Sequence, residues 1–485
     1  MAAAPTAGWN WLKRGVLMLA VSLPPAACAV DQAREIETYK EVTRLLDAPL
    51  PFAPGDPLSL RDAMLLANHH NEQLAIEGEN FLQAIINKQR AVAAFLPTVD
   101  LNYSYAFRDR AGLSGRVDQS TLAADGTITL FDGFANVNVL KRDLATIEQR
   151  RALLLDFQEA LLLDVAQVYY QILRAERAVQ VLRNSLAVQE ERVRETRERE
   201  RAGIVRYLDV AQTEAQASAT RVSLLNAELD VRNSRAILAF ITNAPVEQSP
   251  LTDRFAIPQE IMDLDSLLEM ALTHRQDVRA AEYAAEAARR DVEVAFAQYF
   301  PSVSLDLAGF IHRSPNPAGQ PDWTGLIRAN LPLFTAGLIE ADVREAWSVF
   351  RQNVLALELL RRRVHQDVQV AYENLMASRR RLEELQTQLA AAEQAFRQAE
   401  GSYNVGLATN LERVTAQDQL LNAQLQLASE QYDQKVFYLN LLRAVGLIRL
   451  DNELLAAPSD APEVEIDPAA EQPEALQTPD LVPQE

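Results

Sequence analysis

Four short segments of the chain alternate apolar and polar residues with a period of two, which is the pattern of a β-strand with one apolar face. In the first segment, Val99 and Leu101 fall on one face and Asp100 falls on the other. The other three segments lie at residues 122–130, 302–312 and 323–331. Such alternation is also typical of half-buried strands in soluble sheets. The pattern therefore predicts four strands and leaves the surroundings of their apolar faces open.

Two much longer stretches predict helices. No glycine or proline occurs between residues 133 and 203 or between residues 337 and 401, and both stretches are rich in Ala, Leu, Glu, Gln and Arg. At ~1.5 Å per residue, such helices approach ~100 Å in length. A second helical pattern follows each one, after Gly203 or Gly406. Glycine suits a turn between antiparallel helices, so we expect two tall helical hairpins with their tips at these glycines.

Several motifs recur at a nearly constant distance along the chain. Phe95-Leu96-Pro97 recurs as Tyr299-Phe300-Pro301, 204 residues later. Gly203 recurs as Gly406, 203 residues later. A constant spacing across unrelated motifs indicates two copies of one structural unit.

The duplication divides the chain into six expected parts. They are a signal peptide (1–27), an N-terminal arm (28–57), a first repeat (58–244), a linker (245–258), a second repeat (259–446) and a tail (447–485). Each repeat combines short helices, two strands and one long hairpin, and Ser59 is the expected N-cap that opens the first repeat. Four prolines predict an irregular arm, and the acidic, Pro-rich tail is expected to be disordered.

The charge of the chain argues against one class of partner. Its 47 basic and 67 acidic residues give a formal net charge of −20. Phosphate backbones bind to basic surfaces, so nucleic acid is excluded as an expected partner.

The N-terminus has the pattern of an export signal. Lys13 and Arg14 precede a short apolar run that is not long enough to span a bilayer. The only cysteine, Cys28, follows small residues, as a lipoprotein signal peptidase requires, although Pro25 departs from the usual aliphatic residue. We favour acylation of Cys28 over ordinary cleavage in the Ala-rich stretch. A single cysteine excludes an internal disulfide.

No pattern in the sequence indicates catalysis. Fingerprints of metalloproteases, nucleophile elbows, phosphate loops and dinucleotide sites do not occur. The five histidines are dispersed, and the adjacent His69 and His70 point apart on a helix. We therefore expect no catalytic residue, no metal site and no cofactor.

The export signal favours lipid around the apolar faces of the strands. So does the length of the strands, because a membrane strand needs about 9–11 residues. Four strands cannot close a cylinder, and open sheet edges are not tolerated in lipid. A barrel must then be shared between copies of the chain. Three copies supply twelve strands and two supply eight, and the residues alone do not decide between them.

The order and duplication of these motifs resemble the TolC-type outer-membrane efflux protein family. The resemblance rests on the strand entries at Leu96-Pro97 and Phe300-Pro301, the strand exits at 130–133 and 333–337, and the two hairpin tips. It covers residues 58–446 and implies a mainly α fold with a membrane β-barrel. The implied homotrimer has a twelve-stranded barrel in the outer membrane, and its helices form a tunnel across the periplasm. The implied partners are a periplasmic adaptor and an inner-membrane transporter, in efflux or type I secretion.

The same resemblance assigns roles at the tips, which close the periplasmic mouth in this family. It implies that Asp209 and Tyr403 share a hydrogen bond between hairpins, and that Glu412 belongs to an acidic ring. Ala408 stands where relatives carry a basic residue, and Thr415 stands where some carry a second acid. From the residues alone, solvated carboxylates near a turn are the better explanation of Asp209 and Glu412, and the resemblance brings the gate explanation level with it.

Two other expectations accompany this interpretation. The charged run at residues 190–201 is expected to be a solvated helix face with local ion pairs. A periplasmic adaptor and a coiled-coil scaffold are the alternative functions. An adaptor normally has one hairpin flanked by small β-rich domains, and a scaffold would lack the strands and the leader.

Overall fold

The computed structural model describes residues 32–43, 52–53, 55–109, 116–314 and 320–449, and apart from one N-terminal helix its two halves have the same order of elements. The first half contains α2 (Gln32–Val42), β1 (Leu58–Ser59), α3 (Leu60–His70), α4 (Glu72–Ala93), β2 (Thr98–Asp109), β3 (Arg116–Asp132), α5 (Ala135–Arg201) and α6 (Tyr207–Thr242). The second half contains β4 (Leu251–Thr252), α7 (Leu264–His274), α8 (Gln276–Ala297), β5 (Ser302–Ser314), β6 (Trp323–Asn330), α9 (Leu338–Asn404) and α10 (Asn410–Val445).

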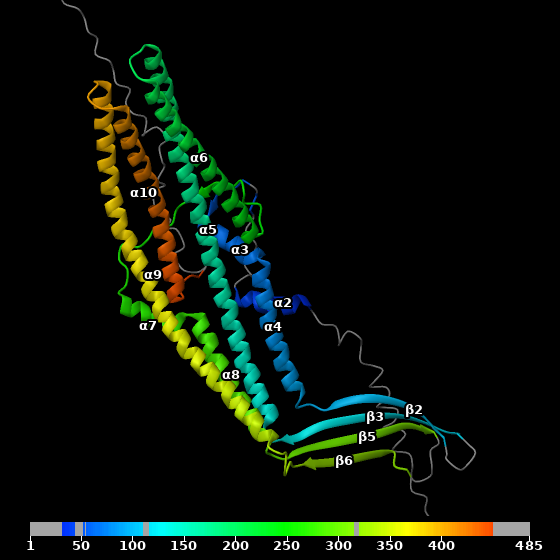
Figure 1. Cartoon of the computed structure of the whole chain (residues 1–485). Helices are drawn as coiled ribbons and strands as arrows, with labels where there is room; N and C mark the ends of the chain where they lie inside the picture. The colour runs from blue at the N-terminus through cyan, green and yellow to red at the C-terminus, as the bar shows by residue number, and fades with distance from the viewer. Residues whose placement is uncertain (1–31, 44–51, 54, 110–115, 315–319, 450–485) are drawn as a thin grey trace, which may run out of the picture.

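Matching helices of the two halves have equal lengths, which confirms the duplication. Helices α5 and α9 each contain 67 residues, and α6 and α10 each contain 36. Both predicted hairpins are present and stand side by side (Figure 1). The Ser59 hydroxyl caps α3 as expected, accepting a hydrogen bond from the Asp62 N–H at 3.2 Å. Along the described residues, no helix combines the length and the apolar character needed to cross a membrane.

Two segments differ from the sequence-based expectation. Part of the arm forms the helix α2 because Tyr39 is buried against α4 at Gly78, where an added Cβ would lie 2.4 Å from the Tyr39 ring. Strands β2 and β3 also extend beyond the alternating segments that predicted them. Their backbone pairing continues as far as Asp109 and Arg116, beyond the last alternating apolar positions.

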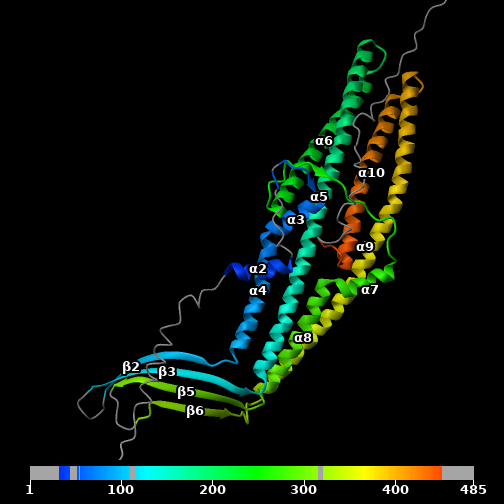
Figure 2. The same cartoon turned by 180° about the vertical axis from the view of Figure 1, so that it is seen from behind.

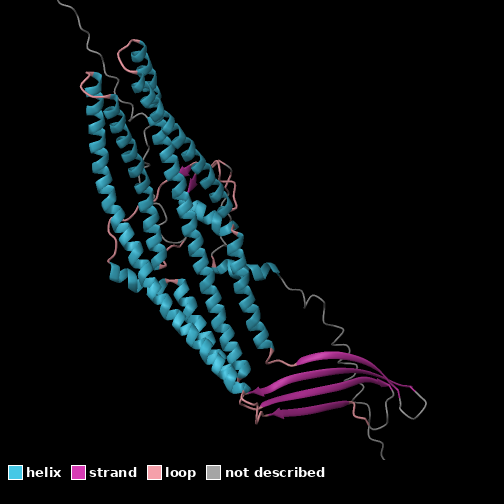
Figure 3. Ribbon diagram, viewed as in Figure 1, coloured by secondary structure: helices cyan, strands magenta, loops and turns pink. Residues whose placement is uncertain are grey.

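The four longer strands form one antiparallel sheet in the order β2-β3-β5-β6 (Figure 3). The register aligns Ile128 with Leu305 and Leu305 with Ile327, so the predicted apolar positions at the centre of the sheet share one face. Beyond the register shifts in β3, Leu122 pairs with His312 and Phe131 pairs with Val303. On the opposite face, the Thr127 hydroxyl donates to the Asp306 carboxylate at 3.2 Å. Strands β2 and β6 are the edges, and neither pairs with another described strand on its outer side.

The helices stand side by side in the same order as the strands to which the chain connects them. Near the sheet, α4, α5, α8 and α9 pack side by side in that order, and towards the tips the order is α6, α5, α10 and α9. The view from behind shows the same succession (Figure 2). One lateral edge of the chain is therefore β2, α4 and α6, and the other is β6 and α9.

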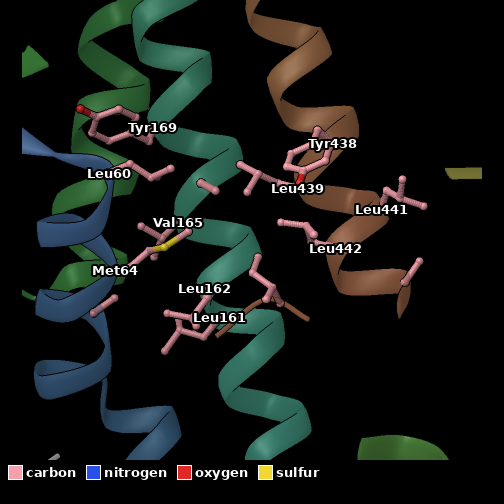
Figure 4. Close-up of a cluster of buried hydrophobic side chains, with 14 of the residues drawn as sticks. Leu60, Met64, Leu161, Leu162, Val165, Tyr169, Tyr438, Leu439, Leu441 and Leu442 are labelled. Atoms are coloured by element: carbon pink, nitrogen blue, oxygen red, sulfur yellow. The ribbon is translucent and has the colours of Figure 1, made fainter. Parts of the chain in front are cut away.

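The main core lies at the middle of α5, where the short elements pack against the bases of the hairpins (Figure 4). Met64 from α3, Val165 from α5 and Leu439 from α10 are fully buried there. The Tyr169 hydroxyl lies 2.8 Å from the carbonyl oxygens of both Leu58 and Thr252. It thereby fastens the parallel β1–β4 pair to α5 and joins the two repeats.

Four ion pairs connect α5 to α6, and their members recur every seven residues along both helices. From base to tip they are Glu176–Arg235, Arg183–Glu228, Glu190–Arg221 and Arg197–Glu214. We call this series the α5/α6 ion-pair ladder. Acid and base exchange helices at each step. The three pairs nearest the tip are substantially exposed, so each of them contributes at most about 1 kcal/mol.

Candidate gate at the hairpin tips

The two hairpins turn at the predicted glycines. Gly203 and Gly406 have φ of +72° and +78°, a left-handed conformation that side chains with a Cβ rarely adopt. In each turn, the next N–H donates back to the end of the preceding helix, from Ile204 to the Arg199 carbonyl at 2.9 Å and from Leu407 to the Ser402 carbonyl at 2.8 Å. Both glycines therefore lie in the turns between the two helices of each hairpin.

The two acidic residues assigned to the gate both cap helices. The Asp209 carboxylate accepts a hydrogen bond from the Arg206 N–H at 3.1 Å, at the start of α6. The Glu412 carboxylate accepts one from the Thr409 N–H at 2.7 Å, at the start of α10. Carboxylates at these positions satisfy free N–H groups and complement the helix dipole. Each acid therefore stabilises its own hairpin, Asp209 as a buried residue and Glu412 as an exposed one.

Tyr403 lies among positive charges. Its ring centroid is 4.0 Å from the guanidinium carbon of Arg413 and 5.7 Å from that of Arg199. Its hydroxyl is buried and has no hydrogen-bond partner among the described residues, so within one chain it does not bond to Asp209. Asp209 meets the second hairpin through its backbone, because the Asn410 side-chain amide donates to its carbonyl at 3.1 Å. The Asp209–Tyr403 bond remains a prediction.

Sequence reasoning missed Arg192, which joins α5 to both helices of the second hairpin. Its guanidinium donates to Gln417 on α10 and to Glu400 on α9, and it lies 4.8 Å from the ring centroid of Phe396. We call Arg192, Phe396, Glu400 and Gln417 the hairpin clamp. Burial lowers the pKa of the Arg192 guanidinium, with the nearby charge of Arg413 acting in the same direction, while Glu400 opposes this shift.

The run at residues 190–201 is therefore only partly a solvated face. Glu190 and Arg197 belong to the ion-pair ladder, as expected, but Arg192 and Thr196 are buried. Gln189 is also buried, and the spacings of three and four residues between it, Arg192 and Thr196 define one helix face. That spacing was the available signal for a buried polar contact between the hairpins.

Comparison with known proteins agrees with this geometry. The sequence pattern of outer membrane efflux proteins matches residues 82–244 and 267–447, which is most of the chain. The chain belongs to the outer membrane efflux protein family. It is 25% identical over 301 residues to outer membrane protein TolC of Vibrio cholerae, covering 60% of this chain and 68% of that protein.

Solved structures of the family share the fold. The outer membrane protein VceC of Vibrio cholerae matches with a TM-score of 0.72 and 22% identity, over 80% of this chain and 96% of that one. The open state of the Neisseria gonorrhoeae MtrE outer membrane channel matches with a TM-score of 0.69 and 21% identity, over 81% and 90%. The predicted family, fold class, outer-membrane location and efflux-channel function are confirmed.

A second group of buried charges in this efflux channel lies at the base of the hairpins. The Arg443 guanidinium on α10 donates to Glu159 at 3.1 Å and also pairs with Asp156, both on α5. Burial raises the pKa of Glu159 to about 7, although Arg443 and Arg449 oppose the shift. The group couples the two repeats at the end opposite the tips.

The adjacent histidines do not form a metal site among the described residues. The His69 and His70 rings have their centroids 6.4 Å apart, and the described residues include no cluster of three or more His, Cys, Asp or Glu side chains able to hold a metal. Cys28 lies outside the described residues, so its acylation stays a prediction.

Proposed function

We propose that three copies of the chain form one passive conduit from the periplasm to the exterior, gated at the hairpin tips. The observation that carries this proposal is the matched lateral order of strands and helices, because it leaves the same two edges free along the length of the chain. An edge strand in lipid requires a partner. Pairing β2 of one copy with β6 of the next closes a shared barrel, and family membership favours twelve strands over eight.

Exposed apolar side chains on both helical edges support association between copies. On α6, Leu225 and Phe240 are 59% and 84% exposed in the single chain. On α9, Leu355 and Leu359 are 69% and 61% exposed. Burying a leucine or phenylalanine of this kind contributes about 1.5–3 kcal/mol, so a few such contacts along each seam favour a closed ring.

We infer that Asp209, Tyr403 and Glu412 act at the gate, with the tips at Gly203 and Gly406. The Tyr403 hydroxyl is buried and has no partner within the described chain, so a hydrogen bond formed when the tips rearrange in the assembly would satisfy it. Glu412 is exposed beside the tip, where three copies would bring three carboxylates together. Like charges ~6 Å apart at an effective dielectric constant of ~20 repel by roughly 3 kcal/mol, so such a ring would attract cations.

The proposed partners are a periplasmic adaptor and an inner-membrane transporter, which would supply the energy that a passive conduit lacks. We propose no catalytic residue, no cofactor and no metal, since conduction needs none. Acylation of Cys28 would anchor the mature N-terminus in the outer membrane, and Cys28→Ser should then abolish lipid labelling. The alternative of a periplasmic adaptor or scaffold is disfavoured by the two hairpins joined to one sheet.

Native mass spectrometry of the detergent-extracted protein tests the assembly, and conductance in planar bilayers tests the conduit. We expect a homotrimer that inserts and conducts ions. A stable monomer or dimer in mild detergent would contradict the trimer, and a trimer that never conducts would contradict the conduit.

A further inference from the structure

A pocket of about 560 Å³ is open at the α9 edge of the chain, between α7 and α9. Leu268 and Leu272 line it from α7, and Val370, Arg362 and His365 line it from α9. Leu272 and Val370 are 45% and 49% exposed, and Arg362 and His365 are exposed as well. The single chain therefore leaves an apolar pocket with a polar rim uncovered along one of its free edges.

The same place in the first repeat is closed. Helices α5 and α9 begin 203 positions apart, so Arg362 and His365 have Glu159 and Leu162 as their counterparts on α5. Glu159 and Leu162 are only 4% and 1% exposed. Helix α10 of the second repeat packs against this part of α5, where Leu439 and Leu162 belong to one core (Figure 4). No described element covers the edge of α9 in this way.

We propose that the C-terminal end of α6 from the next copy fills this pocket, as the end of α10 fills its counterpart. The inference rests on the proposed trimer and names a surface through which its copies meet. Helices α6 and α10 also begin 203 positions apart, which makes them counterparts. On the free side of α6, Ile237 and Phe240 are 45% and 84% exposed. Because the two repeats share one structure, the surface that receives α10 within the chain has a second version that can receive α6.

Two contacts within the chain serve as the template. The Gln167 side-chain amide on α5 donates to the Asn440 side-chain oxygen on α10 at 3.2 Å. The Arg443 guanidinium on α10 donates to the Glu159 carboxylate on α5 at 3.1 Å. Both contacts join the first repeat to the second, so their counterparts join the second repeat of one copy to the first repeat of the next.

The counterpart residues have a different chemistry. Ile237 and Val370 stand at the positions of the first pair, and Phe240 and Arg362 stand at the positions of the second. An aliphatic pair is stabilised by the burial of its exposed surface, and a guanidinium group is attracted to the face of an aromatic ring. Neither contact contains a carboxylate. The closed ring thus alternates between charged seams within each chain and largely apolar seams between chains.

Cross-linking of the detergent-extracted full chain tests the first contact. Gln167 and Asn440 meet through the ends of their side chains, so a short bis-maleimide reagent suits cysteines at the counterpart positions. We expect Ile237→Cys with Val370→Cys to give covalent trimers on a denaturing gel, and each single variant to give none. Leu225→Cys with Val370→Cys should also give none, because Leu225 is exposed on the same helix but lies about 18 Å further along it.

A charge swap tests the second contact. Phe240→Arg places a second guanidinium against Arg362, so the trimer fraction in native mass spectrometry should fall about tenfold or more. Adding Arg362→Glu should restore the trimer, since it rebuilds between copies the ion pair that Arg443 and Glu159 form within the chain. Arg363→Glu is the matched control and should not restore it, because the exposed residue 363 is turned by about 100° about the helix axis.

The outcomes separate the docking from the assembly. A wild-type trimer whose Ile237–Val370 pair does not cross-link, or cross-links no better than the Leu225 pair, would overturn the docking and leave the trimer standing. Undiminished trimer in Phe240→Arg, or rescue by Arg362→Glu that is no better than rescue by Arg363→Glu, would overturn it too. A wild-type monomer would overturn both the docking and the proposed assembly.

Discussion

The hairpin clamp makes a direct prediction for the gate. Arg192→Leu removes the guanidinium that donates to both Glu400 and Gln417, while the leucine retains an apolar contact with Phe396. Hydrogen bonds that involve a charged group contribute about 1.5–3 kcal/mol. Part of this gain is offset in the native state by the desolvation of Arg192 and by its repulsion from Arg413.

A net loss of about 2 kcal/mol per subunit is therefore reasonable for Arg192→Leu. Since about 1.4 kcal/mol corresponds to a factor of ten, each hairpin pair should separate at least about tenfold more often. We expect a higher open probability in single-channel recordings in planar bilayers. The trimer should still assemble, because the core at the middle of α5 and the sheet are untouched.

Arg183→Leu is the matched control, since it removes an arginine of α5 that pairs only within the first hairpin. It should leave the open probability unchanged. If assembled Arg192→Leu channels opened no more often than the wild type, the clamp would not hold the gate and its contacts would be purely structural.

Three further predictions concern titratable side chains. Asp209→Ala or Tyr403→Phe should raise single-channel conductance, since losing one hydrogen bond costs on the order of 1 kcal/mol per subunit; unchanged conductance in both would remove them from the gate. Glu412→Ala should weaken cation selectivity and divalent block without preventing assembly, and unaltered selectivity and block would refute the acidic ring. The pKa of Glu159 is raised from 4.5 to about 7, so its contribution to stability is complete below pH 4.5 and is lost as the pH rises through 7. Denaturation of the wild type should thus show a loss of up to about 3 kcal/mol over this range that Glu159→Gln lacks, and equal pH profiles would refute the assignment.

The long elements were predictable because their signals are local. The absence of glycine and proline from residues 134–200 fixes α5, and Gly203 supplies the left-handed turn that ends the first half of the hairpin. Alternation fixed the shared apolar face of the sheet. It did not fix the ends of β2 and β3, because strand pairing continues through backbone hydrogen bonds after the side-chain pattern stops.

The polar contacts between hairpins were not predictable in the same way. Arg192 and Gln417 are 225 positions apart in the sequence, and the spacing of Gln189, Arg192 and Thr196 marks a helix face without showing what that face contacts. The burial of Arg192 follows from which face of α5 meets α10. The helices and strands could thus be predicted from the sequence. The polar contacts between the hairpins could not, because they depend on how the helices pack.

The α5/α6 ion-pair ladder has a consequence for the alignment of the first hairpin. A coiled coil with a seven-residue repeat is prone to slip by one heptad, because every apolar contact is then replaced by an equivalent one. In this ladder the polarity reverses at each step, so a slip of seven residues would set Arg183 against Arg221 and Glu190 against Glu214. Pairs that are individually weak would become repulsive together. The ladder thus adds little to the free energy of unfolding and instead penalises every hairpin that is out of step by an odd number of heptads.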